Sequence, residues 1–246
     1  MTTLSRLRGA PALALVLGIL SCGSGDPVTG VPDADVRILY IGNSLTYVND
    51  IPGLVQKMAD LDGRSTAHAE ITAPNYALED HWAEGLEKRI RAIKPDVVVM
   101  QQGPSSLPES RTNLVEWSAR IAGVVREVGG EVTLYMVWPA SDRQFAFTAV
   151  AESYSAAARA AGGRLLPAGM SWAEAWERDP QLQLYAEDGV HASYAGSLLA
   201  AETIYSVLFD VDPAAFPRLD DGVSDAQRAV FAEAIASSVV RWRVGD

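Results

Sequence analysis

The stretch Val36-Arg37-Ile38-Leu39-Tyr40-Ile41-Gly42-Asn43-Ser44 decides the fold of this chain. An apolar run with isoleucine and tyrosine ends at a glycine, which predicts a buried strand that leaves the sheet through a tight turn. Apolar runs of the same kind recur further along the chain, at residues 67–72, 96–101, 131–137 and 164–167. Segments of helical periodicity separate them, and this alternation is typical of a parallel sheet covered by helices. We therefore predict an α/β fold, a three-layer α/β/α sandwich with a five-stranded parallel sheet.

The helical segments have apolar residues three and four positions apart, which gives each of them one buried stripe. They cover residues 51–61, 78–93, 114–128, 145–160, 194–209 and 225–242. Gly129-Gly130 ends the third of these helices, and Ser224 with Gln227 forms a capping box before the last. In such folds ligands bind beyond the carboxyl ends of the strands, so the residues that follow each strand are the candidates for chemistry.

The N-terminus has the pattern of an export signal. Arg6 and Arg8 precede the apolar run 10–20, and small residues follow it. The sequence Ile19-Leu20-Ser21-Cys22 resembles a bacterial lipoprotein box, in which Cys22 becomes the acylated first residue of the mature chain. The alternative is a plain secretory peptide with an incidental cysteine.

These features predict three parts of the chain. Residues 1–21 form a signal peptide, residues 22–35 carry the lipidated cysteine and a flexible linker rich in Gly, Pro and Asp, and residues 36–246 form one domain. We expect an exported protein that is anchored to a membrane of the cell envelope through its N-terminal lipid alone, on the periplasmic or the surface side.

Composition limits the partners and the chemistry. The chain has 246 residues, of which 48% are hydrophobic, and a formal net charge of −11. Nucleic-acid binding is disfavoured because Lys57, Lys88 and Lys94 are the only lysines available to neutralise phosphates. With one cysteine the chain cannot form a disulfide within itself, and its three histidines are dispersed, so we predict no metal site and no cofactor.

Ser44 lies directly after the first predicted strand, where a hydroxyl can face a cleft. Taken alone, this serine has two interpretations: it caps the following helix, or it reacts. A phosphate-binding loop is a weak third interpretation, because the turn has one glycine and no adjacent lysine.

The segment Asp188-Gly189-Val190-His191 places a carboxylate three residues before an imidazole. In a tight turn this spacing lets Asp188 fix the tautomer and orientation of His191. The alternative is an ordinary turn with a solvated histidine. His68 lies in a predicted strand and His81 at a predicted helix start, so His191 is the histidine with a carboxylate beside it in a loop.

Ser44, His191 and Asp188 together supply what nucleophilic catalysis on an ester needs: a hydroxyl, a base and a group that holds the base. With these residues the chain resembles the SGNH (GDSL-like) hydrolases over residues 36–210, which have a serine after the first strand and a D-x-x-H motif near the C-terminus. The resemblance implies a flavodoxin-like sandwich of the SGNH hydrolase type, with Ser44 as nucleophile, His191 as base and Asp188 as its partner.

The middle of the chain departs from this family. SGNH hydrolases usually have a glycine after the second strand and Gly-x-Asn-Asp after the third, and these groups join the serine amide in the oxyanion hole. Here Gly103-Pro104-Ser105-Ser106 follows the third strand, so the asparagine is missing. The candidate donors are Gln101, Gln102 and Gly103, together with Asn75 after the second strand. Ordinary hydrogen bonding at turns and strand ends is the alternative for the side chains.

We predict a serine esterase for short acyl esters, with acetyl groups on carbohydrates as the preferred substrates and no cofactor. Trp82, Trp138 and Tyr47 are candidates for an aromatic wall beside the site, or else for core positions. Two alternatives belong to other classes: a surface-anchored glycan-binding module that keeps the scaffold without catalysis, and a nucleotide- or flavin-binding domain of the same topology. The sequence does not determine the oligomeric state.

Overall fold

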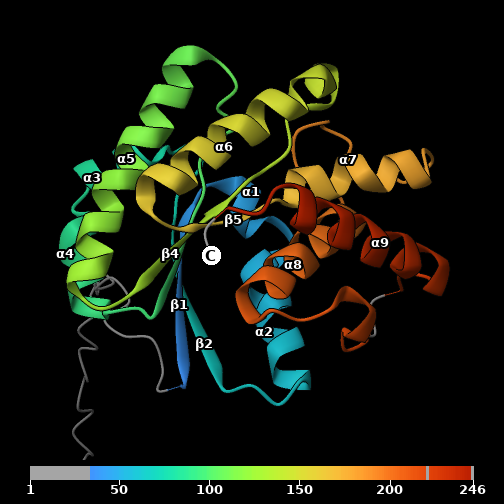
Figure 1. The fold of residues 1–246 in the computed structure, drawn as a ribbon, viewed down its shortest axis with the longest axis horizontal. Helices are drawn as coiled ribbons and strands as arrows, with labels where there is room; N and C mark the ends of the chain where they lie inside the picture. The colour runs from blue at the N-terminus through green and yellow to red at the C-terminus, as the bar shows by residue number, and fades with distance from the viewer. Residues whose placement is uncertain (1–33, 220–221, 245–246) are drawn as a thin grey trace, which may run out of the picture.

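The computed structural model describes residues 34–219 and 222–244. Within them the chain forms one all-parallel five-stranded sheet of order β2-β1-β3-β4-β5, with helices on both faces (Figure 1). The strands are β1 (Val36–Gly42), β2 (Thr66–Thr72), β3 (Val97–Met100), β4 (Glu131–Tyr135) and β5 (Arg164–Leu166). The predicted α/β/α sandwich with a five-stranded parallel sheet is thereby confirmed.

The predicted signal peptide, Cys22 and the linker up to residue 33 lie outside the described residues. Among the residues that are described, none of the helices combines the length and the apolar composition that crossing a bilayer requires.

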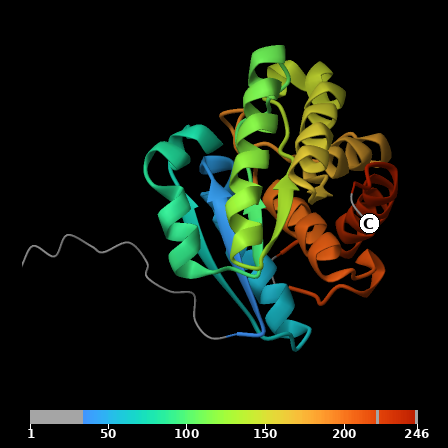
Figure 2. The same cartoon turned by 60° about the vertical axis from the view of Figure 1, so that its left-hand side comes forward.

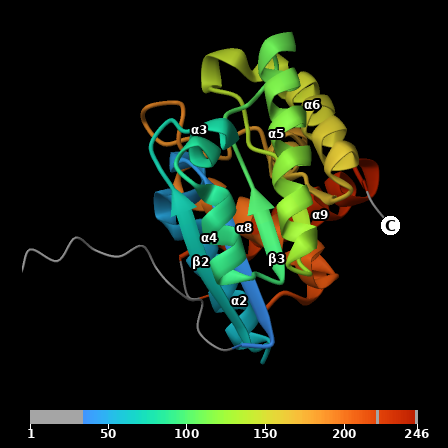
Figure 3. The same ribbon diagram turned by 90° about the vertical axis from the view of Figure 1, so that its left-hand side faces the viewer.

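Helices form the two outer layers. One layer contains α3 (Leu78–Ala83), α4 (Leu86–Ile93), α5 (Pro108–Glu127) and α6 (Phe147–Ala161). The other contains α2 (Ile51–Leu61), α7 (Ala168–Arg178), α8 (Tyr194–Phe209) and α9 (Asp225–Arg241). Figure 3 shows α4 and α5 in front of the sheet with α2, α8 and α9 behind it, and Figure 2 shows α5 and α6 packed side by side.

The sheet is buried between these layers, as a parallel sheet must be. Ile38 to Ile41 in β1 and Val98 to Met100 in β3 are all buried, which explains why these strands appear as continuous apolar runs. Beyond β4 the core continues into a stack of Trp138 on Trp172, whose ring centroids are 3.9 Å apart and whose ring planes are nearly parallel.

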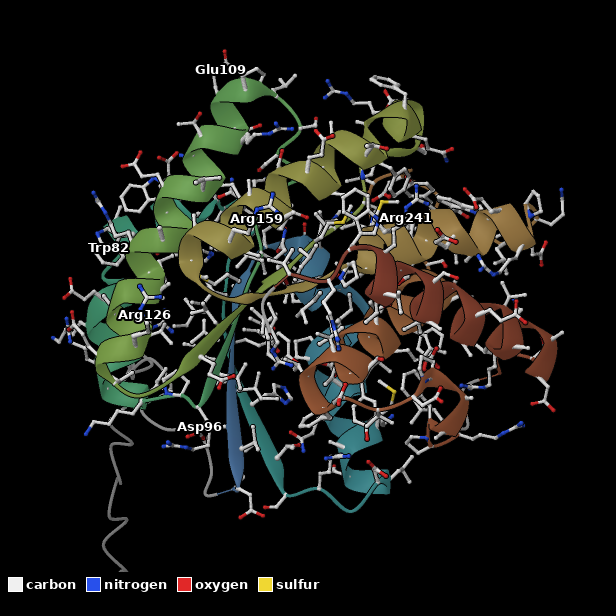
Figure 4. The ribbon with its side chains drawn as sticks, viewed as in Figure 1. Trp82, Asp96, Glu109, Arg126, Arg159 and Arg241 are labelled. Atoms are coloured by element: carbon white, nitrogen blue, oxygen red, sulfur yellow. The ribbon has the colours of Figure 1, made fainter. Side chains whose placement is uncertain are left out.

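The strands end at the same edge, and the site must therefore be sought there. At the opposite edge, the backbone N–H and the guanidinium of Arg37 both donate to Asp96, which ties β1 to β3 at their amino ends. Figure 4 shows Asp96 at this lower end of the sheet. The short helix α1 (Ser44–Tyr47) and the 3-10 turn η1 (Val48–Asp50) follow β1 at the carboxyl edge.

Most predicted helices are found, and two differences have local causes. The predicted helix 78–93 is two helices, because Gly85 has a left-handed backbone (φ 84°) that breaks it. Helix α7 was not predicted, since its buried face includes the polar residues Ser171 and Glu174, which obscure the apolar period. The capping box is confirmed: Ser224 Oγ accepts from Gln227 N at 3.3 Å, and Gln227 Oε1 accepts from Ser224 N at 3.2 Å.

Candidate active site

Asn43, and not Ser44, caps the helix that follows β1. The Asn43 side chain accepts a hydrogen bond from Leu45 N at 3.1 Å, and Ser44 is the first helical residue. The capping interpretation of Ser44 is therefore wrong. The Ser44 side chain is partly exposed, and within the described residues it has no hydrogen-bond partner, so its hydroxyl is available for chemistry.

The Gln101 side chain holds the turn that contains Ser44, here called the serine turn, through hydrogen bonds. Its Oε1 accepts from Asn43 N and from Thr46 Oγ1, both at 2.8 Å. Its Nε2 donates to Asn43 Oδ1 at 3.0 Å and to the carbonyl of Gln102 at 2.6 Å. Gly42 is required here, because a Cβ on it would lie 2.4 Å from Gln101 Oε1. Both amide hydrogens of this fully buried side chain are used for structure.

The Gln102 side chain is committed in the same way. Its Oε1 accepts from Leu78 N at 3.2 Å, and its Nε2 donates to Ser105 Oγ at 2.9 Å and to Asn113 Oδ1 at 3.4 Å. We expected one of these two glutamines to offer an amide to the oxyanion. The structure gives both amides other partners, because a buried polar side chain at the end of a central strand must be satisfied inside the protein.

Two of the four oxyanion candidates keep free donors. Asn75 is exposed, and among the described residues its side chain has no hydrogen-bond partner. Its backbone is left-handed (φ 62°), the conformation that a glycine would favour at this place. The Asn75 loop is joined to the serine turn, since Asn43 Nδ2 donates to Tyr76 O at 3.0 Å. Gly103 lies after Gln102, with its carbonyl held by the Tyr154 hydroxyl at 3.2 Å.

Asp188 and His191 form a hydrogen-bonded pair. His191 Nδ1 lies 2.6 Å from Asp188 Oδ2, and Asp188 Oδ1 accepts from the backbone N–H of Val190 and of His191, each at 2.9 Å. The hydrogen bond from His191 and then these backbone bonds lower the pKa of Asp188 to about 2. The turn needs Gly189, whose φ is 67°. An ionised carboxylate is thus held against one side of the imidazole.

The residues on either side of His191 are also fixed. Trp138 Nε1 donates to Val190 O at 3.0 Å. On the other side, Asn49 Nδ2 donates to Ala192 O at 3.0 Å and to Ser197 Oγ at 2.9 Å. Because Asn49 follows Ser44 by five residues, this bond joins the serine segment to the histidine loop.

His191 Nε2, the nitrogen that faces away from Asp188, is shielded from solvent, and no described residue forms a hydrogen bond with it. A buried nitrogen without a partner costs free energy, so its retention calls for an explanation. With Nδ1–H bound to the carboxylate, Nε2 carries the lone pair. The loop therefore presents a base that can take a proton.

Sequence reasoning missed His81. This histidine is buried at 3% exposure, its Nε2 donates to Gly42 O at 2.9 Å, and burial lowers its pKa. It supports the serine turn from α3. Its position within the run 78–93 indicated a helix, but nothing in the local pattern could show that the turn after β1 lies against it.

The predicted aromatic wall is wrong for Trp138, which is only 1% exposed and packs in the core. Its indole N–H still holds the histidine loop. Trp82 lies on the outer side of the α3–α5 layer (Figure 4), with its ring 5.9 Å from that of Trp117. Tyr47 remains an exposed aromatic residue next to the serine turn, at 37% exposure.

A surface depression of about 520 Å³ adjoins this edge along the β3–α5 loop. Its lining includes Gln102 and Gly103 and three charged residues, Glu79, Glu109 and Arg143. Ser44 and His191 lie outside its lining.

No protein-family model matches this chain, and no curated protein was found similar to it. Solved structures do match. A DUF4886 family protein from Bacteroides uniformis has a TM-score of 0.72 at 16% identity, over 83% of this chain and 95% of that one. A candidate SGNH hydrolase from Slackia heliotrinireducens has a TM-score of 0.59 at 25% identity, over 70% of this chain and 98% of that one.

A catalytic mutant of the acetylxylan esterase Axe2 from Geobacillus stearothermophilus has a TM-score of 0.51 at 17% identity, over 70% of this chain and 93% of that one. The neighbours thus include a candidate SGNH hydrolase and an acetylxylan esterase. The chain shares their fold, a five-stranded parallel sheet between two layers of helices.

Proposed function

We propose that this protein is a serine esterase. Ser44 Oγ attacks the carbonyl carbon of an ester while His191 Nε2 takes the hydroxyl proton, and the same proton then passes to the departing alcohol. Water hydrolyses the acyl-serine in a second round of the same steps, which releases the acid and restores the hydroxyl. Asp188 holds Nδ1–H and stabilises the imidazolium in both rounds.

The observation that carries this proposal is the state of the His191 ring. One nitrogen is bound to a carboxylate at 2.6 Å, while the other is shielded from solvent and has no partner among the described residues. A histidine with only a structural role would be expected to use both nitrogens or to leave one in water. The bond from Asn49 to Ala192 O ties the segment that follows Ser44 to the loop that contains His191, which further supports the pairing.

We assign the oxyanion to the Ser44 backbone N–H, with the Gly103 N–H and the Asn75 side-chain amide as the other donors. These groups fit because Gln101 and Gln102 have no amide hydrogen to spare. Asn75 has the further advantage that its exposed amide has no described partner to give up. Donors of this kind stabilise the charge that develops on the carbonyl oxygen.

The proposed substrates are short acyl esters, with acetyl groups on carbohydrates preferred. The depression beside Gly103 has charged residues in its lining, Glu79, Glu109 and Arg143, that can bind hydroxyl groups, and one structural neighbour is an acetylxylan esterase. The test compares acetate release from an acetylated xylo-oligosaccharide with hydrolysis of p-nitrophenyl octanoate. A clear preference for the octanoate would contradict this substrate class while leaving the serine mechanism in place.

One observation favours a second function, a glycan-binding module without catalysis: the two glutamines after β3 do not contribute to an oxyanion hole. A fluorophosphonate probe separates the two. The esterase predicts that Ser44 Oγ displaces fluoride and keeps the phosphonate, so that the protein is labelled and Ser44→Ala is not. Equal lack of labelling in both proteins, with retained glycan binding, would favour the module.

Export and lipid anchoring through Cys22 remain part of the proposal on the sequence pattern alone. The expected mature chain begins at an acylated Cys22 and partitions into detergent, and Cys22→Ala should leave the membrane fraction. A Cys22→Ala protein that stays with membranes would exclude the anchor.

A further inference from the structure

A second group of side chains, which could bind a metal ion, lies on the face of the sheet that α2 covers. Asp50, His68 and Glu70 each offer a ligand atom, and these atoms all lie within 4.8 Å of one another. His68 and Glu70 are two residues apart on β2, so they point to the same face. Asp50 is the N-cap of α2, which packs on this strand. The fold thus brings Asp50 next to one histidine and one carboxylate of β2.

The His68 ring is oriented by Gln56 on α2. Gln56 Nε2 donates to Thr66 O and Thr66 Oγ1, both at 2.7 Å, and to Asp60 Oδ1 at 2.8 Å. These bonds fix which end of the amide is oxygen. Gln56 Oε1 therefore faces His68 Nδ1, 3.4 Å away, and accepts its hydrogen. The lone pair is then on Nε2, and ligating histidines are commonly held in this way.

The carboxylates have unused capacity. Glu70 is half-buried, and in the described part of the chain it has neither a hydrogen-bond donor nor a cation beside it. Asp50 uses Oδ1 to cap α2 through Gly53 N at 3.0 Å, which leaves Oδ2. Two carboxylates at this spacing repel each other, and a bound cation would relieve this repulsion.

A further unpartnered group lies beside them. Tyr40 on β1 is paired in register with Glu70 and shares its face. Its ring is edge-on to that of His68, with centroids 6.1 Å apart. The Tyr40 hydroxyl is fully buried and forms no hydrogen bond with any described residue, and the charge of Glu70 acts on it. A buried hydroxyl next to an uncompensated carboxylate indicates a polar ligand at this place.

We propose that Asp50, His68 and Glu70 bind one Zn²⁺ ion. Zinc accepts imidazole nitrogen and carboxylate oxygen at about 2.0–2.2 Å, so ligand atoms this close together need only small side-chain rotations to meet one ion. Three protein ligands leave the fourth tetrahedral position to water. The imidazole favours zinc over Ca²⁺ and Mg²⁺, which prefer oxygen ligands throughout. None of the three ligands is Ser44, Asp188 or His191, and the proposal does not depend on the esterase proposal.

The test is a calorimetric titration of Zn²⁺ into the purified, untagged protein after EDTA treatment and dialysis. We expect one ion per chain, and at least about tenfold weaker binding in Glu70→Gln and in His68→Gln. Glu109→Gln is the matched control, because Glu109 is an exposed carboxylate on α5, in the other helical layer. It should bind zinc as the wild type does.

Thermal unfolding in EDTA checks the variants. Each should unfold near the wild-type temperature without metal, and added Zn²⁺ should raise the unfolding temperature of the wild type and of Glu109→Gln more than that of Glu70→Gln. Absence of zinc binding by the wild type would overturn the proposal. So would zinc binding that is equal in Glu70→Gln, His68→Gln and the wild type, or stronger binding of Ca²⁺ or Mg²⁺ than of Zn²⁺.

Discussion

Two loops lie at the same edge of the sheet, one after β3 and one before α8. They use their polar side chains in opposite ways. After β3, Gln101 and Gln102 give every amide hydrogen to a protein acceptor. In the loop before α8, His191 keeps one nitrogen shielded from solvent, and no residue in the described part of the chain bonds to it. Buried polar groups with all their hydrogen bonds formed stabilise the fold. A buried polar group without a partner reduces stability, and a catalytic role of His191 would explain why it is kept. Residue type alone did not separate these roles.

The strongest way to break this comparison is to change the partner of His191. In Asp188→Asn the amide can present its N–H to Nδ1, which favours the tautomer with the hydrogen on Nε2. We expect the rate of ester hydrolysis to fall roughly 10⁴-fold with little change in the fold. Steady-state kinetics and circular dichroism test this. Asp188→Asn activity within tenfold of the wild type would mean that His191 is not the base.

The oxyanion assignment predicts the next largest effect. Asn75→Gly removes the amide and keeps the left-handed backbone, so it separates chemistry from strain. We expect kcat to fall about 10²-fold with KM little changed. Pro74→Ala, in the same exposed turn, is the control and should stay within about threefold. An unaltered kcat in Asn75→Gly would remove this residue from the oxyanion hole.

The structural role of the loop after β3 is tested by measuring the stability of a Gln101 variant. Gln101→Leu leaves Asn43 N and Thr46 Oγ1 buried without their acceptor. We expect the free energy of unfolding to fall by about 2–4 kcal/mol in urea titrations. Gln183→Leu, at an exposed position, should change it by less than about 0.5 kcal/mol. If Gln101→Leu were as stable as the wild type, the side-chain amide of Gln101 would not stabilise the fold.

Asn49 links the segment that contains Ser44 to the loop that contains His191. Removing its side chain should have a smaller effect on kcat. Asn49→Gly keeps the left-handed backbone (φ 57°) and deletes the hydrogen bonds to Ala192 O and Ser197 Oγ. Because Asn49 acts through the His191 loop, we expect kcat to fall about tenfold, with an unchanged KM and an unchanged pH profile. A shifted KM with an unchanged kcat would indicate a role in substrate binding instead.

The smallest expected effect is on the stability of the protein at acidic pH. The pKa of Asp188 is about 2 in the folded protein and near 3.8 in an unperturbed carboxyl. Its stabilising contribution is therefore complete above about pH 4 and is lost as the pH falls towards 2. The difference in unfolding temperature between wild type and Asp188→Asn should shrink over this interval. A difference that stays constant from pH 5 to pH 2 would contradict the ionised pair.

The sequence was sufficient where contacts are local. Helices 51–61 and 194–209 have the predicted bounds, and the Asp188–His191 bond spans only three residues. It was insufficient where partners are far apart. Gln101 meets Asn43 across 58 positions, and Asn49 meets Ala192 across 143. Periodicity shows which residues are buried, but not which distant group faces them.

The same reason explains why the Asp50, His68 and Glu70 group was not predicted. His68 and Glu70 are two residues apart in an ordinary strand, and Asp50 comes from the end of another loop. Only the packing of α2 on β2 brings them together. In strands a shift of one residue reverses the face of every side chain, so register had to be known first.

The central claim is that Ser44 and His191 act together on an ester. The most direct measurement is hydrolysis of p-nitrophenyl acetate by the purified protein beside Ser44→Ala and His191→Ala. We predict measurable turnover in the wild type and a loss of about 10³-fold or more in each variant, with the double variant no worse than either alone. Equal rates in all the proteins, with each variant folded, would contradict the claim.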